Sequence, residues 1–179
     1  MANKVKFNLK NVHIAPKTLS GYGEIFAMPG AVSLSLDPQG DIEKFYADGI
    51  VYYQSAPNNG YEGSLELALV PDKFRTDILK ETESSNGLLV ENVDSKMTDF
   101  AMGFQIDGDV NNRYYWFYNC SVSRPSLEAT TLEESKTPQT ETLNISCVSD
   151  ENGNIKVRST DSFSGGAEAW FADVIQPVA

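Results

Sequence analysis

The sequence is poor in the residues that most often carry catalysis and metal binding. Its 179 residues include one histidine and two cysteines. With one histidine, a catalytic triad or a multi-histidine metal site would depend on His13 alone, and no Ser or Cys near it has the context of an activated nucleophile. No glycine-rich phosphate loop opens a helix. We therefore predict a protein that is not an enzyme and that needs no cofactor and no metal.

Positive charge and long apolar runs are scarce too. Lys and Arg number 14 against 25 Asp and Glu, which gives a net charge of −11. Affinity for nucleic acid comes chiefly from clustered Lys and Arg, so this balance argues against a DNA-binding surface. No stretch approaches the roughly 20 apolar residues of a membrane helix, and the first residues lack the apolar run of a signal peptide. We expect a cytoplasmic origin and no membrane partner.

The two cysteines and the acidic pairs suggest little chemistry. Cys120 and Cys147 lie in strand-like runs, where a disulfide is geometrically possible. Without an export signal, two buried free thiols are the preferred interpretation. Glu133 and Glu134 are adjacent carboxylates in a Ser/Thr-rich connection over 123–140, and neighbouring positions do not converge across one sugar ring.

One acidic stretch has part of a calcium-loop pattern. Asp107, Asp109 and Asn111 have the spacing with which such a loop begins. Asn112 and Tyr118 stand where the loop requires Gly and Glu, so the bidentate acid is missing. An acidic turn between strands is the better prediction.

Alternation of apolar and polar residues dominates the rest of the chain and predicts half-buried strands. Runs of this kind, or rich in strand formers, cover 5–10, 31–36, 65–69, 100–106, 113–122 and 142–147, and Asn152-Gly153 predicts a hairpin turn leading to 155–157. A helix is predicted at about 71–81, where Phe74 and Ile78 lie one turn apart and Asn86-Gly87 offers a stop. The predicted fold is mainly β: an antiparallel sandwich or barrel with one short helix, in a single domain over 1–179.

A long loop or projecting hairpin is predicted at about 37–60, between two sets of turn-forming residues. It carries Phe45, Tyr46, Tyr52 and Tyr53, together with further apolar residues. Exposed apolar surface usually marks a contact site, so these aromatics are candidates for a subunit interface. The alternative, equally open at this stage, is that they fold back into the core.

A second aromatic run, over 114–118, is the best candidate for a binding function of another kind. An exposed row of aromatics would form a platform for carbohydrate, and a non-catalytic carbohydrate-binding sandwich is the alternative function. Alternation, however, places Tyr114, Trp116 and Tyr118 on one face and Tyr115 and Phe117 on the other. Strands with aromatics on both faces are more often buried on both sides, which is the interpretation we prefer.

The opening segment, about 1–17, is basic. Lys4, Lys6 and Lys10 precede the first acidic residue, Glu24. A basic arm on an acidic body would suit docking onto a neighbouring copy, so these lysines are further interface candidates. An edge strand whose lysines discourage aggregation explains the pattern equally well.

Several stretches, in the same order, resemble the major tail protein family of phages with long, non-contractile tails. The stretches that carry the resemblance are NKVKFNLKNVH (3–13), PGAVSL (29–34), FYAD (45–48), NGYEGSLE (59–66), PDKFR (71–75), YNC (118–120) and PQTETL (138–143). The resemblance implies a tail-tube fold, hexameric rings and a hollow tube of stacked rings through which DNA passes without specific binding. It also implies tape measure, tail tip or baseplate and tail terminator proteins as partners, and a location in the virion tail.

Overall fold

The computed structural model describes residues 3–131 and 137–177, and these form a mainly β, antiparallel structure with two short helices. The elements are β1 (Lys6–Thr18), β2 (Gly21–Tyr22), β3 (Phe26–Ala27), β4 (Ala31–Pro38), β5 (Glu43–Ala47), β6 (Ile50–Ser55), β7 (Tyr61–Leu67), α1 (Asp72–Asp77), β8 (Thr82–Glu83), β9 (Leu89–Val90), β10 (Phe100–Gly108), β11 (Arg113–Val122), β12 (Glu141–Val148), β13 (Lys156–Arg158) and α2 (Gly166–Trp170). The predicted fold class is confirmed. Within the described residues, no helix is long and apolar enough to cross a membrane.

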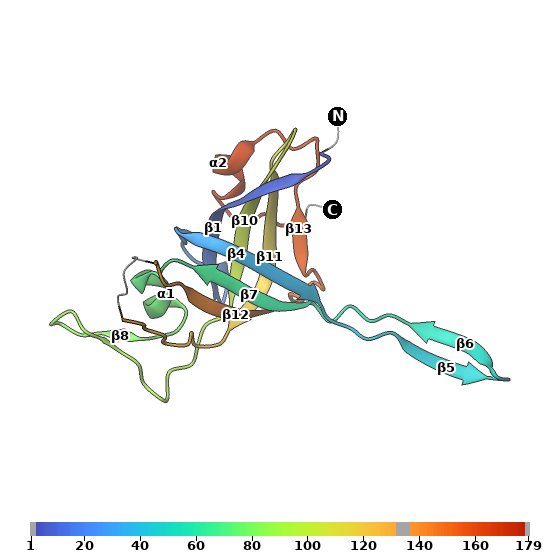
Figure 1. The fold of residues 1–179 in the computed structure, drawn as a ribbon, viewed down its shortest axis with the longest axis horizontal. Helices are drawn as coiled ribbons and strands as arrows, with labels where there is room; N and C mark the ends of the chain where they lie inside the picture. The colour runs from blue at the N-terminus through green and yellow to red at the C-terminus, as the bar shows by residue number, and fades with distance from the viewer. Residues whose placement is uncertain (1–2, 132–136, 178–179) are drawn as a thin grey trace.

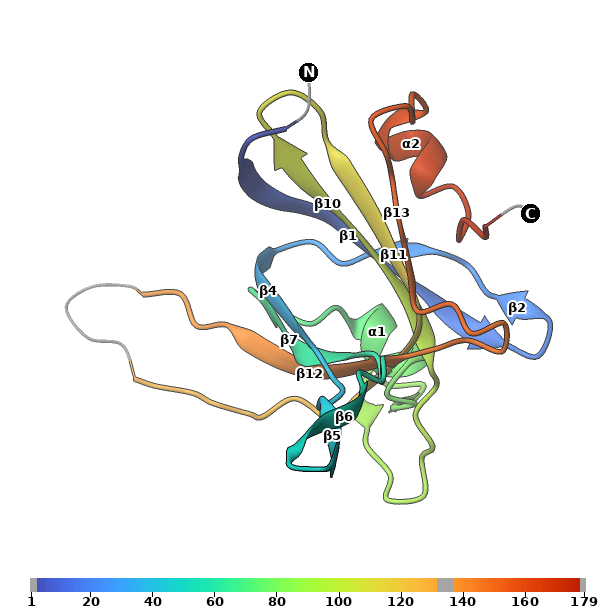
Figure 2. The same ribbon diagram turned by 90° about the vertical axis from the view of Figure 1, so that its right-hand side faces the viewer.

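One nine-stranded sheet carries the fold and bends around its own core. Its strand order is β2-β1-β10-β11-β12-β7-β4, with β3 added to β1 and β13 added to β11. Figures 1 and 2 show β1, β10 and β11 as one layer, crossed by β4, β7 and β12 as the other. The main core fills the space between these layers, with Ile14, Met102, Leu65 and Leu143 all fully buried.

The bend lies at β11, which is paired along one edge by two different strands. Its second half pairs with β12, from Asn119 opposite Val148 onward, and its first half pairs with β13. The predicted Asn152-Gly153 turn is present, since the N–H of Asp150 donates to the carbonyl of Asn154 at 2.8 Å. The next strand, β13, nevertheless pairs with β11 and not with β12. The prediction of a simple hairpin at this turn is therefore wrong.

A second, smaller core lies on the outer face of β10 and β11. It contains Tyr114, Trp116 and Tyr118 from one face of β11, and α2 supplies Trp170 to cover them. The indole N–H of Trp116 donates to the carbonyl of Trp170 at 3.1 Å, which satisfies its buried donor. Helix α2 is absent from the sequence prediction, because five residues that begin with the second glycine of a pair give no helical periodicity to detect.

The aromatic run of β11 is buried on both faces, as predicted. Phe117 faces the main core and Trp116 the second core, where it is 0% exposed. This strand therefore presents no exposed aromatic platform for carbohydrate. The carbohydrate-binding alternative depended on such a platform and loses that support.

Helix α1 closes one end of the main core but is shorter than predicted. Phe74 and Ile78 are fully buried, and the ring of Phe74 meets that of Phe100 edge to face at 5.7 Å. The helix ends at Asp77 because Lys80 adopts a positive φ of 60°, which a right-handed helix does not allow. The proposed stop at Asn86-Gly87 instead lies in the turn between β8 and β9.

Candidate self-assembly surfaces

The predicted loop at 37–60 is a regular hairpin that stands clear of the body. Strands β5 and β6 pair from Glu43 opposite Ser55 to Ala47 opposite Ile50. Asp48 and Gly49, with φ of 53° and 76°, form the tight turn at the tip. Figure 1 shows the hairpin extending along the longest axis of the molecule, away from every other element.

All four predicted interface aromatics lie exposed on this hairpin. Their exposed fractions run from 61% for Phe45 to 71% for Tyr52, so none of them folds back into the core. Paired residues share a face of a two-stranded ribbon, which places Phe45 beside Tyr53 and Tyr46 beside Val51. Phe45 and Tyr46 are successive residues of β5 and point to opposite faces, and Tyr52 is the extra residue of the bulge between the two pairs. The hairpin therefore presents apolar side chains on both faces.

An isolated hairpin with two apolar faces is an unusual arrangement in a free chain. Two-stranded ribbons are marginal in water unless a further strand or layer covers one face. Here no described residue outside the hairpin covers either face, and Ile50 is also 64% exposed. The arrangement favours a partner that covers the hairpin.

The lysines of the opening segment lie on a strand of the body. From Lys6 to Thr18 the segment is β1, paired to β10 along its length, so the interpretation as a projecting arm over 1–17 is wrong. Lys10 forms an ion pair with Asp107 at 2.6 Å, and this contact lowers the pKa of the Asp107 carboxyl. The backbone N–H of Lys4 donates to Asp109, which ties the start of the chain to the β10–β11 turn. Lys4 and Lys6 themselves are exposed.

Two strand edges have backbone groups available for a further strand. β4 is the last strand of the sheet, and no described strand pairs with its outer side. The outer side of β1 pairs with β3 and β2 only from His13 onward, which leaves the first half, within the described residues, without a partner on that side. Bulges at Lys6/Leu9 and Lys10/His13, together with lysines, are features that limit indiscriminate edge pairing.

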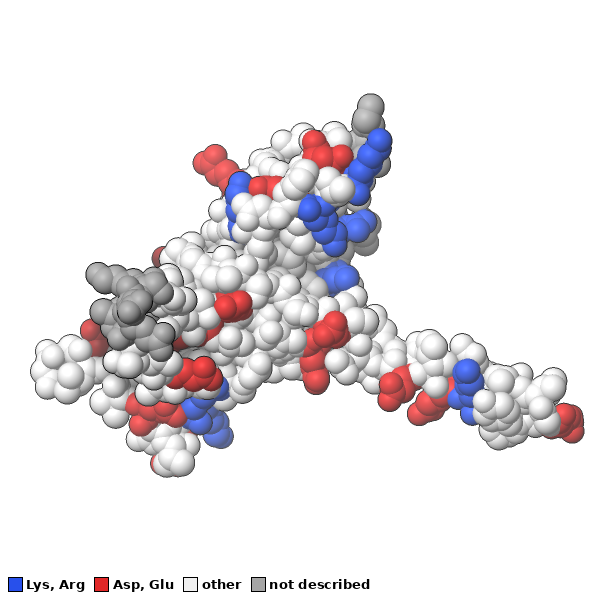
Figure 3. Space-filling model, viewed as in Figure 1, with Lys and Arg blue, Asp and Glu red and all other residues white. Residues whose placement is uncertain are grey.

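A cleft opens between β1 and β4 beside the base of the hairpin. It has a volume of about 450 Å³, with Leu36, Phe104 and Tyr115 among its apolar lining, and Lys6 and Lys156 among its charged lining. Figure 3 shows Lys and Arg side chains gathered on this part of the body, while Asp and Glu predominate on the hairpin. The uneven charge predicted from the sequence is thus a property of the surface as well.

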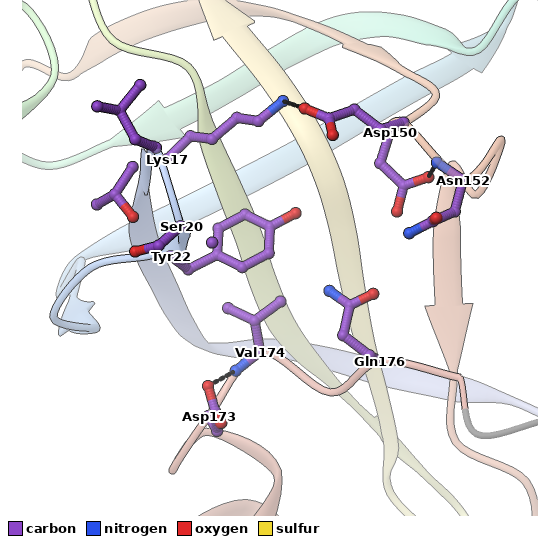
Figure 4. A pocket seen from close by; sticks show the side chains of 12 residues that line it. Lys17, Ser20, Tyr22, Asp150, Asn152, Asp173, Val174 and Gln176 are labelled. Carbon is purple, nitrogen blue, oxygen red and sulfur yellow. Dashed lines mark hydrogen bonds and ion pairs between the residues drawn. The ribbon is translucent and has the colours of Figure 1, made fainter.

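A hollow of about 500 Å³ lies between the β1–β2 turn and the chain after β12 (Figure 4). Lys17 reaches toward Glu151 at 4.0 Å, and the Tyr22 hydroxyl donates to the carbonyl of Tyr118 at 2.8 Å. Asp150 accepts backbone N–H bonds within its own turn. Lys17, Tyr22 and Asp150 are thus engaged by neighbouring protein groups, and the hollow does not point to a ligand.

The remaining chemical candidates serve structure. Cys120 and Cys147 are unlinked and fully buried, with sulfurs 3.1 Å apart across β11 and β12. Burial, with Cys147 beside it, raises the pKa of the Cys120 thiol, which disfavours a reactive thiolate. His13 stacks on Phe171 at 4.2 Å. Among the described residues no three His, Cys, Asp or Glu side chains form a metal-binding group. The pair Glu133 and Glu134 lies outside the described residues.

Comparison with known proteins adds no family assignment. No protein-family model and no curated protein sequence matches this chain.

The structure brings the four hairpin aromatics together and places the lysines elsewhere, so the predicted interface residues form two separate surfaces. Sequence reasoning missed another exposed apolar segment, over 82–98, where Leu88 and Val93 lie exposed. The sequence indicates this segment only by a few apolar residues that lie in a polar stretch and follow no helix or strand periodicity.

Proposed function

We propose that this chain is a structural virion protein that packs with copies of itself into the tail tube of a long-tailed, non-contractile phage. In this proposal the subunits form hexameric rings, and the rings stack into a tube through which DNA passes. The observation that carries it is the hairpin β5–β6, which exposes Phe45, Tyr46, Tyr52 and Tyr53 well outside the body. A surface of this kind has a clear physical role only when another chain covers it.

The free strand edges support ring formation. A closed ring needs a heterologous interface, in which one patch of each subunit meets a different patch of its neighbour. The outer side of β4 and the first half of β1 are two different edges of one sheet, at its opposite ends. Pairing between such edges of adjacent copies would satisfy backbone groups that otherwise stay open to aggregation.

The net charge supports a conduit for DNA. Six chains at −11 each would place −66 on a ring. A lumen that carries part of this charge would repel phosphate, so that DNA slides past without adhering. The tape measure, tail tip or baseplate, and tail terminator proteins belong to the same proposal as the partners inside the tube and at its two ends.

The test is assembly of the purified protein, followed by negative-stain microscopy and sedimentation velocity over a range of protein and salt concentrations. We expect rings or tubes for the wild type and none for Phe45→Ser combined with Tyr46→Ser. The variant should unfold at the wild-type temperature, because both side chains are exposed.

Leu19→Ser is the control, since Leu19 is a fully exposed apolar residue in the turn after β1 and far from the hairpin. It should assemble as the wild type does. A wild-type protein that remains monomeric under all conditions contradicts the proposal, as does a hairpin variant that assembles normally. If the variant fails to fold, Phe45 and Tyr46 contribute to the stability of the body and not to a contact between copies.

A further inference from the structure

The cleft between β1 and β4 is lined by three cations and by no acid. Lys6 lines it from β1, and Lys156 and Arg158 line it from β13. Lys156 and Arg158 are two residues apart in one strand, so they share a face. Among the described residues, none of the three forms an ion pair with a carboxylate. In a chain with 25 acids against 14 bases, such a cluster is suited to an acidic partner.

The rest of the lining is mostly apolar and only partly covered. Leu36 of β4, Tyr61 of β7 and Tyr115 of β11 line the cleft and are half-buried. The ammonium of Lys156 lies 4.3 Å from the centroid of the Tyr61 ring and donates to its hydroxyl at 2.7 Å, which holds this cation beside the apolar groups. The volume of about 450 Å³ lies within the roughly 300–1,000 Å³ of cavities that hold small ligands, so the cleft has room for aromatic side chains.

One face of the hairpin β5–β6 has the complementary character. Glu43 and Phe45 are alternate residues of β5 and share a face. Tyr53 lies opposite Phe45 in β6 and joins them on that face. Lys44 lies between Glu43 and Phe45 in the chain and therefore points to the other face. Within the two strands, the first face thus carries two exposed aromatics and a carboxylate, and no cation.

The other exposed surfaces do not match this face in charge. The apolar segment 82–98 carries three acids against one lysine, Lys96. The hollow of about 500 Å³ in Figure 4 has three acids around Lys17. A further hollow of about 520 Å³ is lined by Glu62 and by no cation. An acidic face that approached any of these surfaces would meet like charge, which weakens association. Charge therefore selects the cleft among them.

We propose that the hairpin β5–β6 of one copy docks in the cleft of a second copy, with the face that carries Glu43, Phe45 and Tyr53 turned inward. This inference rests on the proposed function and identifies the surface that receives the hairpin. The chain's own hairpin leads away from the body and leaves its own cleft open (Figure 1). Hairpin and cleft are different surfaces, so a copy that receives one hairpin still offers its own to a third copy, and the contact repeats along the assembly.

In this contact the aromatics supply the affinity and the charges fix the orientation. An aromatic side chain buries roughly 150–250 Å² when it is covered. Phe45 and Tyr53 are 61% and 64% exposed, so most of that area is available for a partner to cover. Buried aromatics are the usual anchors of protein interfaces. Ion pairs between Glu43 and the cations of the cleft would add little affinity but would disfavour wrong partners and wrong orientations.

Zero-length cross-linking tests the contact directly. A carbodiimide joins a carboxylate to a lysine amine that lies in contact with it. Assemblies grown from equal amounts of isotope-labelled and unlabelled protein should yield mixed-isotope peptides that join Glu43 of one copy to Lys156 or Lys6 of another, identified by mass spectrometry. Tubes that give cross-links between copies at other sites, and none from the hairpin to either lysine, would overturn the inference and leave the tube standing.

Charge reversal measures what the cleft contributes to assembly. Lys156→Glu with Arg158→Glu should need at least about tenfold more protein to assemble, because it sets like charges against Glu43. Lys80→Glu with Lys96→Glu is the matched control, since both lysines are exposed, lie outside the cleft and give the same change in net charge. The control should assemble at a protein concentration closer to that of the wild type. Adding Glu43→Lys to the cleft variant should lower the required concentration again.

The outcomes distinguish this inference from the proposed function. A cleft variant that assembles as readily as the control overturns the inference, and so does a lack of recovery with Glu43→Lys. A wild type that joins hairpin to cleft in small assemblies but never forms tubes refutes the tube and keeps the inference. A wild type that stays monomeric under all conditions refutes both. Circular dichroism melting checks the fold of each variant, and Arg158→Glu alone, at an exposed position, replaces the double change if the latter lowers the melting midpoint.

Discussion

Gly103 in β10 leaves room for the largest side chain of the second core. A Cβ at this position would lie 2.9 Å from three ring atoms of Trp116, which is closer than such atoms approach. Trp116 is held on its other side by α2 and by its bond to Trp170, so it has no space to retreat. Because Gly103 has no Cβ, the indole of Trp116 can pack between β10 and α2.

Gly103→Ala should destabilise the fold by about 1–3 kcal/mol, the usual cost of overpacking a tight core. Urea denaturation followed by tryptophan fluorescence would measure the change. Gly23→Ala is the matched control, because its new Cβ would have its nearest neighbours at 3.5 Å. A cost for Gly103→Ala no larger than that for Gly23→Ala would show that Trp116 can move aside.

The buried phenols predict how stability changes at high pH. Burial raises the pKa of Tyr22 and of Tyr118 to about 12. The unfolded pKa is about 10, so the neutral phenols contribute stability that is fully present below pH about 10 and is lost as pH rises toward 12. Tyr118 also donates to the carbonyl of Ile175 at 2.8 Å, which fixes the end of the described chain.

Tyr118→Phe should therefore lower stability at neutral pH and flatten its decline between pH about 10 and 12, because one ionising group is removed. Equilibrium unfolding at a series of alkaline pH values measures this slope. Tyr52→Phe, on the exposed hairpin, is the control for the loss of stability at neutral pH, because Tyr52 is 71% exposed. Equal slopes for Tyr118→Phe and wild type would contradict the assignment.

At the scale of elements, the hairpin and the body are independent. The hairpin begins where Gln39 and Asn59 pair, with the N–H of Asn59 donating to the carbonyl of Gln39 at 3.0 Å. Beyond that point its large side chains are all exposed. The body thus contributes nothing to the hairpin except a fixed base.

Replacing residues 41–57 with Asn-Gly should leave the body folded, with its thermal midpoint close to that of the wild type, because no buried contact is lost. Circular dichroism melting and sedimentation velocity together test this. Assembly should be abolished in the same protein. A large drop in the midpoint would show that the hairpin supports the body.

At the scale of the whole molecule, charge opposes assembly. Each copy carries −11, and assembly brings these charges close together. Salt screens such repulsion, with a Debye length of about 10 Å at 0.1 M falling to about 3 Å at 1 M. Raising sodium chloride should therefore promote tube formation, measured by light scattering at fixed protein concentration. Suppression by salt would show that attraction between opposite charges dominates the contacts.

The local pattern of the sequence determined the strands, their faces and much of the core. Alternation over 113–122 placed Trp116 and Phe117 on opposite faces, and the structure confirms both positions. This succeeds because a strand repeats every two residues, so the face of each side chain is settled within the strand itself. Helix α1 was predicted from the helical repeat, because Phe74 and Ile78 lie one turn apart on the same face.

Only the tertiary structure decided which strands meet and which apolar residues stay outside. That β12 and β13 share one edge of β11, or that α2 covers Trp116, depends on contacts between segments far apart in the chain. The sequence left Phe45 and Tyr46 equally suited to a core or a contact surface. Their exposure follows from the hairpin base, which directs β5 and β6 away from the body and its core.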